Sequence, residues 1–500
     1  MKSGKNMNNS LNLEGRSYPI YGIYLLTFLL WLPSYQYQLS SDAVSYLSIA
    51  RHFSEANWRV AINGFWSPLY SVLLGPAYWL KLDPALFARC LNGVTGLICL
   101  WKLHSLLKLL KLPKDEGYAI LIGSIPLFCW YALMIISPDI LVVGVCLYYV
   151  GFWLEENSPF YHLAFIILIG YFSKTYLLPI LLIHTLIRGL SRKIRFSELN
   201  GRHLLLFLLI LGVGLGGWGV LLFQKYETWT LGFSGIYNWR LVGELPLKQP
   251  YDIGQLIAPV HGEAISMWED PSFLLPPLWS ITEKPGHLLI LLMDNVGDFF
   301  MGKGFGILCM MVLVGSLVYW VSKRRDSNLS FLLGFFWIFP VGYWLIVLEQ
   351  RYVWINHLLC PILIYLLGDI LLRKYHVLRK AIFFTAIFIM TFVPFSRLWI
   401  HEDQGVGEYQ DGQMIQEFIP AGSSYATDQD WGTHLYLAYY GDLAYWGRVD
   451  AEEGAELEGY LVQEKIQYFA GHPDQVYEFI QYQLVPKSEE LGFKLYEKME

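Results

Sequence analysis

Long apolar runs recur along this chain from residue 18 to about residue 396, and they constrain the fold more than any other feature. Most are long enough to cross a hydrocarbon core about 30 Å thick as a single helix. The composition agrees, since 55% of the 500 residues are hydrophobic and only 16% are charged, against about 25% charged in an average soluble protein. The sequence therefore predicts a polytopic α-helical membrane protein.

Lysine and arginine concentrate in some polar connections and avoid the others. Such excesses are typical of cytoplasmic connections, so we expect the rich clusters, including the N-terminus, to be cytoplasmic. The clusters are Lys2, Lys5 and Arg16, then Lys108, Lys111 and Lys114, then residues 188–202, 323–325 and 373–380. One arrangement of about eleven helices satisfies them all. Its spans are 18–36, 85–107, 118–136, 138–154, 160–172, 175–188, 203–223, 303–322, 329–348, 353–372 and 380–396.

This topology holds only if the apolar stretch 68–80 does not cross the membrane, because a crossing would place the next basic cluster outside. We therefore expect an interfacial helix there, and a second one over 42–53, whose apolar residues share one helical face. The alternative is that 68–80 is a true span and the charge rule fails once. For the short pair 160–172 and 175–188, a re-entrant hairpin gives the same sidedness.

After residue 396 the chain changes to a soluble composition. We expect residues 1–396 to form the membrane module, with outer loops at 37–84 and 224–302. Residues 397–500 are expected to form a small α/β domain outside the cytoplasm. Its alternating stretches are 435–440, 466–469 and 493–496, and its helix-like stretch is 476–483.

Several ionisable residues lie at the outer ends of the predicted spans, next to apolar helix: Asp42, Asp139, Lys174, Glu349 and Arg351. Ionisable groups at such positions are functional candidates, although an interfacial charge can also snorkel to water. Each has a simpler alternative. Asp42 and Asp139 suit helix caps, Lys174 suits a tight turn, and Arg351 suits a surface pair with Glu349. Their placement on one face of the membrane favours a shared site.

The remaining signals are weaker. Residues 428–430, Asp-Gln-Asp, resemble an acid-x-acid nucleotide-sugar motif, but in an outer domain they are more typical of a turn. His52, His261 and His287 show no metal-ligand spacing, so no histidine-based metal site is predicted. The net charge of -6 provides no basic stripe for nucleic acid. The outer-loop tryptophans, which suit an interfacial belt or sugar stacking, are Trp66, Trp229, Trp239, Trp268 and Trp279.

As a set, these motifs make the chain resemble the glycosyltransferase C superfamily, and within it the bacterial branch related to protein O-mannosyltransferases and lipid A aminoarabinose transferases. The resemblance covers residues 40–355. The motifs that carry it are Asp42 with Tyr46, Pro68-Leu69-Tyr70, Ser137-Pro138-Asp139, Ser173-Lys174, Gly235-Ile236-Tyr237-Asn238 and Glu349-Gln350-Arg351-Tyr352.

The resemblance implies transfer of a sugar, with inversion, from a polyprenyl phosphate to an acceptor hydroxyl on the non-cytosolic side. A phosphate leaving group needs fixed cations rather than a general acid, whereas the hydroxyl must lose a proton to a base. By this resemblance Asp42 would be the base and Asp139 would orient the acceptor or the sugar. The substrate-binding set would be Tyr46, Lys174, Glu349, Arg351 and Tyr352.

The chain departs from the family pattern at two places. Ala43 stands where many relatives have a second acidic residue, and Trp66-Ser67-Pro68 replaces Lys-Pro-Pro. The second departure leaves one phosphate contact unassigned and puts the identity of the substrate in doubt.

The expected partners are a polyprenyl-phosphate sugar, an acceptor of unknown class and membrane lipids, in a bacterial plasma membrane. No cofactor is implied with certainty, and a divalent metal is left open. The alternatives are a polysaccharide polymerase or O-antigen ligase, a lipid or sugar transporter, and a non-enzymatic scaffold. A transporter would favour ionisable groups near the mid-bilayer and paired broken helices, and neither pattern is present in the sequence.

Overall fold

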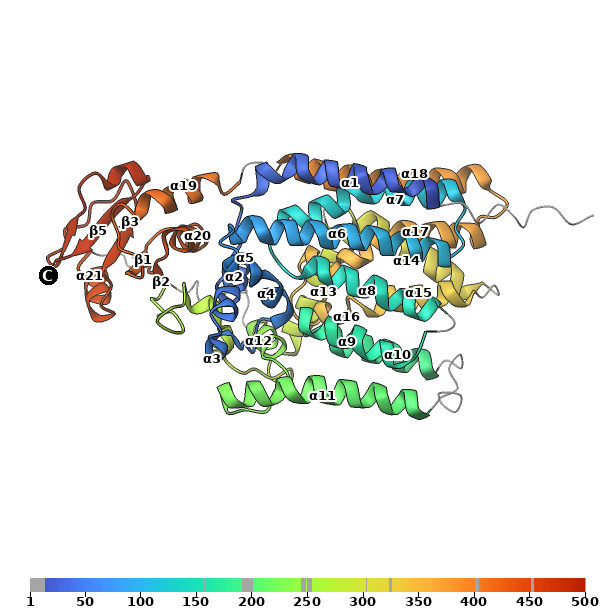
Figure 1. The fold of residues 1–500 in the computed structure, drawn as a ribbon, viewed down its shortest axis with the longest axis horizontal. Coiled ribbons are helices and arrows are strands. Elements are labelled where there is room, and N and C mark those ends of the chain that lie inside the picture. The colour runs from blue at the N-terminus through green and yellow to red at the C-terminus, as the bar shows by residue number, and fades with distance from the viewer. Residues whose placement is uncertain are drawn as a thin grey trace, which may run out of the picture.

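The computed structural model describes residues 14–155, 158–190, 201–243, 249, 254–302, 304–322, 326–400, 404–450 and 454–499. Basic residues 192–195 and 323–325, which the topology prediction used, lie outside this range. A bundle of apolar helices forms most of the molecule (Figure 1). Its members are α1 (Glu14–Tyr35), α6 (Pro84–Leu109), α7 (Lys114–Met134), α8 (Asp139–Leu154), α9 (Tyr161–Ser173), α10 (Leu177–Leu190), α11 (Gly201–Tyr226), α13 (Pro285–Met301), α14 (Gly306–Val321), α15 (Ser327–Ile338), α17 (Trp354–Leu371) and α18 (His376–Ile400).

A helix lies at each of the predicted spans, and the chain is a multi-pass membrane protein. Within the described residues, five helices are long and apolar enough to cross a membrane, or six if the bent pair α13 and α14 forms one span. Three apolar helices, α8, α9 and α10, are shorter than that. In α17 83% of the apolar window is buried, against 17% in α11, so α17 lies at the centre of the bundle and α11 presents its apolar side chains to lipid.

One predicted span boundary was wrong. The span expected over 329–348 stops when α15 ends at Ile338, and a one-turn helix, α16 (Val341–Trp344), follows. Pro340 lies at this break, where its ring removes a backbone donor that a continuous helix needs. The outer loop expected over 224–302 contains the apolar helix α13, in addition to α12 (Ser234–Leu241).

The connection between α1 and α6, expected as the first outer loop, folds into short helices at one end of the bundle, between the bundle and the C-terminal domain (Figure 1). These helices are α2 (Ser41–Ser54), α3 (Trp58–Ala61), α4 (Pro68–Leu74) and α5 (Pro76–Trp79). Prolines begin both α4 and α5. Even as one continuous helix, residues 68–79 would extend only about 18 Å, less than the hydrocarbon core. The structure therefore agrees with an interfacial segment at 68–80 and not with a span.

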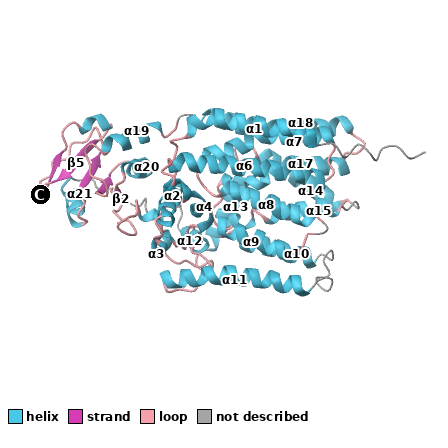
Figure 2. Ribbon diagram, viewed as in Figure 1, coloured by secondary structure: helices cyan, strands magenta, loops and turns pink. Residues whose placement is uncertain are grey.

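The C-terminal domain is a five-stranded sheet with three helices (Figure 2). The strand order is β2-β1-β3-β5-β4, with parallel pairing of β1 to β2 and β3 and antiparallel pairing of β5 to β3 and β4. Its elements are α19 (Val406–Ile415), β1 (Ser424–Thr427), α20 (Trp431–Gly441), β2 (Ala444–Arg448), α21 (Gly454–Gln463), β3 (Tyr468–Gly471), β4 (Tyr482–Leu484) and β5 (Lys494–Lys498). The α/β class is confirmed.

Two local predictions in this domain failed. Residues 435–440 belong to helix α20 rather than to a strand, and 476–483 is irregular up to the start of β4. In the first case the apolar residues also suit a helix that packs one face on a sheet, and a run this short does not separate the two periods.

The domain is joined to the large outer loop through backbone hydrogen bonds. The amide of Tyr445 donates to the carbonyl of Ile265 over 2.7 Å, and the amide of Ile257 donates to the carbonyl of Trp446 over 2.8 Å. Arg51 of α2 also pairs with Asp442 over 3.3 Å. These contacts hold one side of the outer loop in place next to α2.

Candidate active site

A cavity of about 620 Å³ opens at the end of the bundle that carries α2 and α4. Several separate parts of the described chain line it: residues 40–46, 65–67, 135–139, 171–179, 231–238 and 343–352, together with Gln249 and Trp268. All seven site residues predicted from the sequence lie on its wall: Asp42, Tyr46, Asp139, Lys174, Glu349, Arg351 and Tyr352.

Asp42 lies in the first turn of α2 and pairs with Arg351. Its Oδ2 lies 2.7 Å from Nη2 of Arg351, although 309 residues separate the two in sequence. The capping alternative for Asp42 was wrong, because Ser40 is the N-cap and its hydroxyl accepts the Ala43 amide. The carboxylate is therefore directed to the cavity rather than to the backbone of its own helix.

Asp139 begins α8 and pairs with Lys174, which lies between α9 and α10. Its Oδ1 lies 2.7 Å from the lysine Nζ, and its Oδ2 accepts the hydroxyl of Ser137 over 2.8 Å. Pro138 occupies the N-cap position of α8, so Asp139 is not a cap. Lys174 does lie in a turn, as the simpler alternative required, but its ammonium also points to the cavity wall.

Arg351 connects the two aspartates to the last motif. Its Nε lies 2.7 Å from Oε2 of Glu349 and 3.8 Å from Oδ2 of Asp139. The surface pair with Glu349 thus exists, together with the contact to Asp42. Tyr352 completes the group, because its ring lies 3.6 Å from the ammonium of Lys174, a cation-π arrangement.

Aromatic side chains form the side of the cavity around Tyr46. The Tyr46 ring lies 5.0 Å from that of Trp66 and 5.3 Å from that of Tyr70. The indole Nε1 of Trp268, from the large outer loop, lies 3.4 Å from Oδ1 of Asp42. The cavity therefore combines a charged wall with an apolar, aromatic wall, as sites for small ligands commonly do.

No protein-family model and no curated protein sequence matches the chain. Among solved structures, it is similar to ArnT from Cupriavidus metallidurans bound to undecaprenyl phosphate. The TM-score is 0.53 and the identity 12%, over 95% of this chain and 97% of that one. Apo ArnT from the same organism gives a TM-score of 0.43 at 12% identity, with the same coverage. The arabinofuranosyltransferase AftD from Mycobacteria gives 0.49 at 10% identity, over 96% of this chain and 40% of that one.

The match to undecaprenyl-phosphate-bound ArnT extends over nearly the whole of both chains. This chain shares its fold with ArnT.

Within this fold the departure at residues 66–68 has a visible structural result. The Ser67 hydroxyl accepts the backbone amide of Thr175 over 3.1 Å, so the start of α4 is joined directly to the turn that carries Lys174. Trp66 fills the neighbouring space and donates its indole N–H to the Trp268 carbonyl over 3.2 Å. The position therefore supports the wall of the cavity and supplies no cation to it.

The charge of the site is nearly balanced. Three carboxylates, Asp42, Asp139 and Glu349, face two cations, Lys174 and Arg351, so the formal sum is -1 with all five ionised. Burial lowers the pKa of the Lys174 ammonium from its ordinary value of 10.5, while Asp139 acts in the opposite direction. Both cations are thus already paired before any substrate enters.

Sequence reasoning missed some residues of the site and overestimated others. Tyr343 stacks on Tyr352 at 4.8 Å, but it lies in an apolar run that gave no distinguishing signal. Of the outer-loop tryptophans, Trp66 and Trp268 line the cavity and the other three do not. Residues 428–430, expected as a turn, form the bend between β1 and α20, and Asp430 caps α20 by accepting the Thr433 amide over 2.8 Å.

Proposed function

We propose that this chain is an inverting glycosyltransferase. It moves a sugar from a polyprenyl-phosphate donor to an acceptor hydroxyl on the extracytoplasmic side of the membrane. The observation that carries the proposal is the convergence of Asp42, Asp139, Lys174 and Arg351 on one cavity at the end of a membrane bundle. Undecaprenyl phosphate bound to ArnT, a protein of the same fold, supports the choice of donor class.

In the proposed reaction Asp42 is the general base. It removes the proton of the acceptor hydroxyl while the hydroxyl oxygen forms a bond to the anomeric carbon of the sugar. The bond between that carbon and the phosphate oxygen breaks on the opposite face, and the electron pair leaves with the polyprenyl phosphate. Lys174 and Arg351 meet the charge of the leaving group, and Asp139 orients the acceptor or the sugar.

Because Asp42 is paired with Arg351, binding of the donor helps to make Asp42 available as the base. In the free site, Oδ2 of Asp42 is occupied by the guanidinium at 2.7 Å. A donor phosphate competes for the same guanidinium, whose planar fork suits phosphate well. When Arg351 turns to the phosphate, Oδ2 becomes free to accept a hydroxyl proton. Proton removal then takes place mainly in sites that already hold a donor.

The proposed location follows the basic clusters of the sequence. The N-terminus lies in the cytoplasm of a bacterium, residues 1–396 form the catalytic module in the plasma membrane, and residues 397–500 lie outside. Helix α2 and the C-terminal domain lie toward the same end of the bundle (Figure 1), and α2 contributes Asp42 and Tyr46 to the cavity, which supports placing both the cavity and the domain on the extracytoplasmic side. The sugar and the class of acceptor are not assigned.

The test is transfer of label from a radiolabelled polyprenyl-phosphate sugar. Membranes that contain the protein should move label from the lipid fraction to an acceptor, and membranes with Asp42→Asn should not. Release of intact labelled donor across the bilayer would instead favour the transporter. Label transfer that persists in Asp42→Asn would favour a polymerase or ligase mechanism without a first-loop base.

A further inference from the structure

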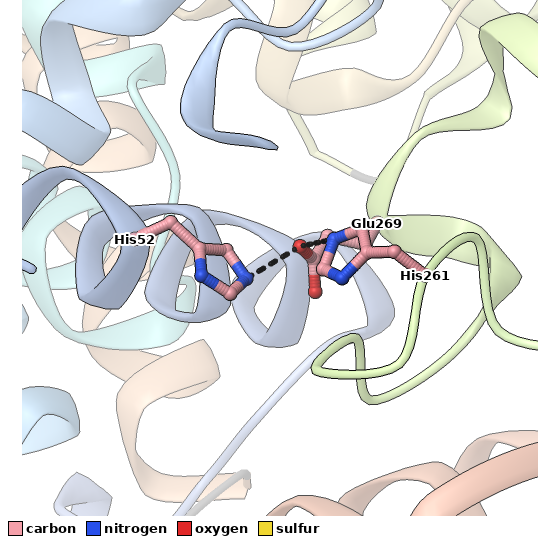
Figure 3. A group of neighbouring side chains, drawn as sticks. All are labelled: His52, His261 and Glu269. Atoms are coloured by element: carbon pink, nitrogen blue, oxygen red, sulfur yellow. Dashed lines mark hydrogen bonds and ion pairs between the residues drawn. The ribbon is translucent and has the colours of Figure 1, made fainter. Parts of the chain in front are cut away.

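A second cluster lies at the other end of α2, outside the cavity. His52 of α2, and His261 and Glu269 of the large outer loop, point toward one another (Figure 3). The Nε2 atoms of His52 and His261 each lie 3.0 Å from Oε1 of Glu269. Two imidazoles therefore converge on one carboxylate oxygen, and the three ligand atoms lie within 4.8 Å of one another.

His52 contacts carboxylates but makes none of the well-formed hydrogen bonds that a buried imidazole normally has. Its side chain is fully buried, and neither ring nitrogen makes a hydrogen bond. Its Nδ1 faces the carboxylates of Glu263 and Glu55 only at 3.7 and 4.0 Å. Buried polar groups are nearly always hydrogen-bonded, whereas Nε2 has only the ion-pair contact with Glu269, which does not meet hydrogen-bond geometry, so a ligand bound between the two groups would satisfy this nitrogen better.

The separations suit a metal ion. Tetrahedral zinc with bonds of about 2.0–2.1 Å holds its ligand atoms about 3.3 Å apart, and the observed 3.0 Å contacts differ from this by a few tenths of an ångström. Two histidines and one carboxylate form a recognised zinc ligand set that leaves a fourth position for water. The His261 side chain is 25% exposed, so water reaches the cluster from that side.

Neighbouring groups orient the candidate ligands as they do around metals. The hydroxyl of Ser48 donates to Oε2 of Glu269 over 2.5 Å, which leaves Oε1 for the imidazoles. The two carboxylates beside Nδ1 of His52 favour a proton on that nitrogen. At His261 the Glu263 amide lies 3.3 Å from Nδ1. An ion at Nε2 moves the imidazole proton to Nδ1, so this long contact opens on binding.

We propose that His52, His261 and Glu269 bind one divalent transition-metal ion, zinc by ligand preference, which fastens the large outer loop to α2. Asp42 and His52 are ten residues apart, or about 15 Å along a helix, so this ion does not touch the reacting atoms. Its role is to position Trp268. That residue adjoins Glu269, and its carbonyl accepts the hydroxyl of Ser45 over 2.8 Å.

The test is the metal content of the purified full-length chain. The protein is prepared with an affinity tag that lacks histidine and is dialysed against a weak chelator. Its metal content is then measured by inductively coupled plasma mass spectrometry. We expect about one zinc per chain, and its loss in His261→Gln and in Glu269→Gln. His472→Gln is the matched control, because His472 is an exposed residue of the C-terminal domain, and it should keep the metal.

A second measurement, the visible absorption of bound cobalt, keeps the proposal testable if some variants fold poorly. Cobalt added to the chelated wild type should give the visible absorption of a four-coordinate site, and His261→Gln, at a partly exposed position, should not give it. The proposal is overturned if the wild type binds neither zinc nor cobalt stoichiometrically, or if His261→Gln binds as much as His472→Gln. Neither measurement uses a sugar donor, so failure here is separate from failure of the proposed transferase reaction.

Discussion

The two carboxylates at opposite ends of helix α2, Asp42 and Glu269, differ in their exposure and in their partners. At the N-terminal end, Asp42 faces a cavity and pairs with a guanidinium that a phosphate can draw away. At the C-terminal end, His52 and Glu269 are closed in, with exposed fractions of 0% and 3%. A charge on an open wall can exchange partners during a reaction, whereas an enclosed one keeps them. We therefore assign chemistry to the first end and loop anchoring to the second.

Asp42→Asn should have the largest effect on activity. The amide keeps the shape of the carboxylate but cannot accept the proton, so the transfer rate should fall about 10²–10⁴-fold. Initial rates with a labelled polyprenyl-phosphate sugar measure the loss. Asp442→Asn removes a carboxylate from the exposed pair with Arg51 and is the control. Equal rates for Asp42→Asn and the wild type would remove Asp42 from the reaction.

Arg351→Gln tests the ion pair between Asp42 and Arg351 by removing the cation. Removing one partner of a fully buried ion pair costs about 3–5 kcal/mol, and the loss here should be smaller because the Arg351 and Asp42 side chains are 13% and 17% exposed. The unfolding temperature in detergent should fall, and activity should be lost. The double variant Asp42→Asn with Arg351→Gln should regain stability but not activity. If it unfolds as early as Arg351→Gln alone, the pair does not explain the loss.

The pH profile sharpens the assignment of Lys174. Its pKa is lowered from 10.5 by burial, so the ammonium loses its proton at a lower pH than an exposed lysine. Activity that needs this charge should therefore decline, as pH rises, at values below 10.5. Arginine keeps its proton throughout, so Lys174→Arg should move this alkaline limb of kcat/KM upward. Identical limbs in the two proteins would show that another group titrates there.

Trp268→Phe tests the contact between the two regions with the smallest expected effect. It removes the indole N–H that lies 3.4 Å from Asp42 and keeps an aromatic ring. The loss of one hydrogen bond of about 1 kcal/mol corresponds to a rate about fivefold lower. Steady-state kinetics measure it, and metal content should stay unchanged because the ligands are intact. A loss as large as that of Asp42→Asn would mean that Trp268 has a larger role than orientation.

The sequence predicted the charged part of the cavity because charges are rare beside apolar helices. Asp42, Asp139, Lys174 and Arg351 each stood out for that reason, and the fold brings all four together. Which carboxylate meets which cation was not predictable, since a separation of 309 residues carries no local signal. The simpler alternative for Asp42, a helix cap, failed because Ser40 already performs that role.

The sequence did not predict the histidine cluster, because its members are also far apart in the chain. His52 and His261 lie 209 residues apart in the printed sequence, and metal-ligand spacing is informative only when ligands share a helix or a short loop. Helix α13 was overlooked because the charge rule fixes sidedness, and an extra apolar helix inside an outer loop leaves every basic cluster where it was. Periodicity located the helices, but it did not locate the break at Pro340.

The separation between Asp42 and Arg351 also matters while the protein is being made. The ribosome must add more than 300 residues after Asp42 before its counter-ion exists, and Tyr445, which holds the outer loop through Ile265, comes later still. Until then a nascent chain lacks the ion pair between Asp42 and Arg351 and one wall of the cavity. Under the proposed function, catalytic competence is thus acquired only near the end of synthesis.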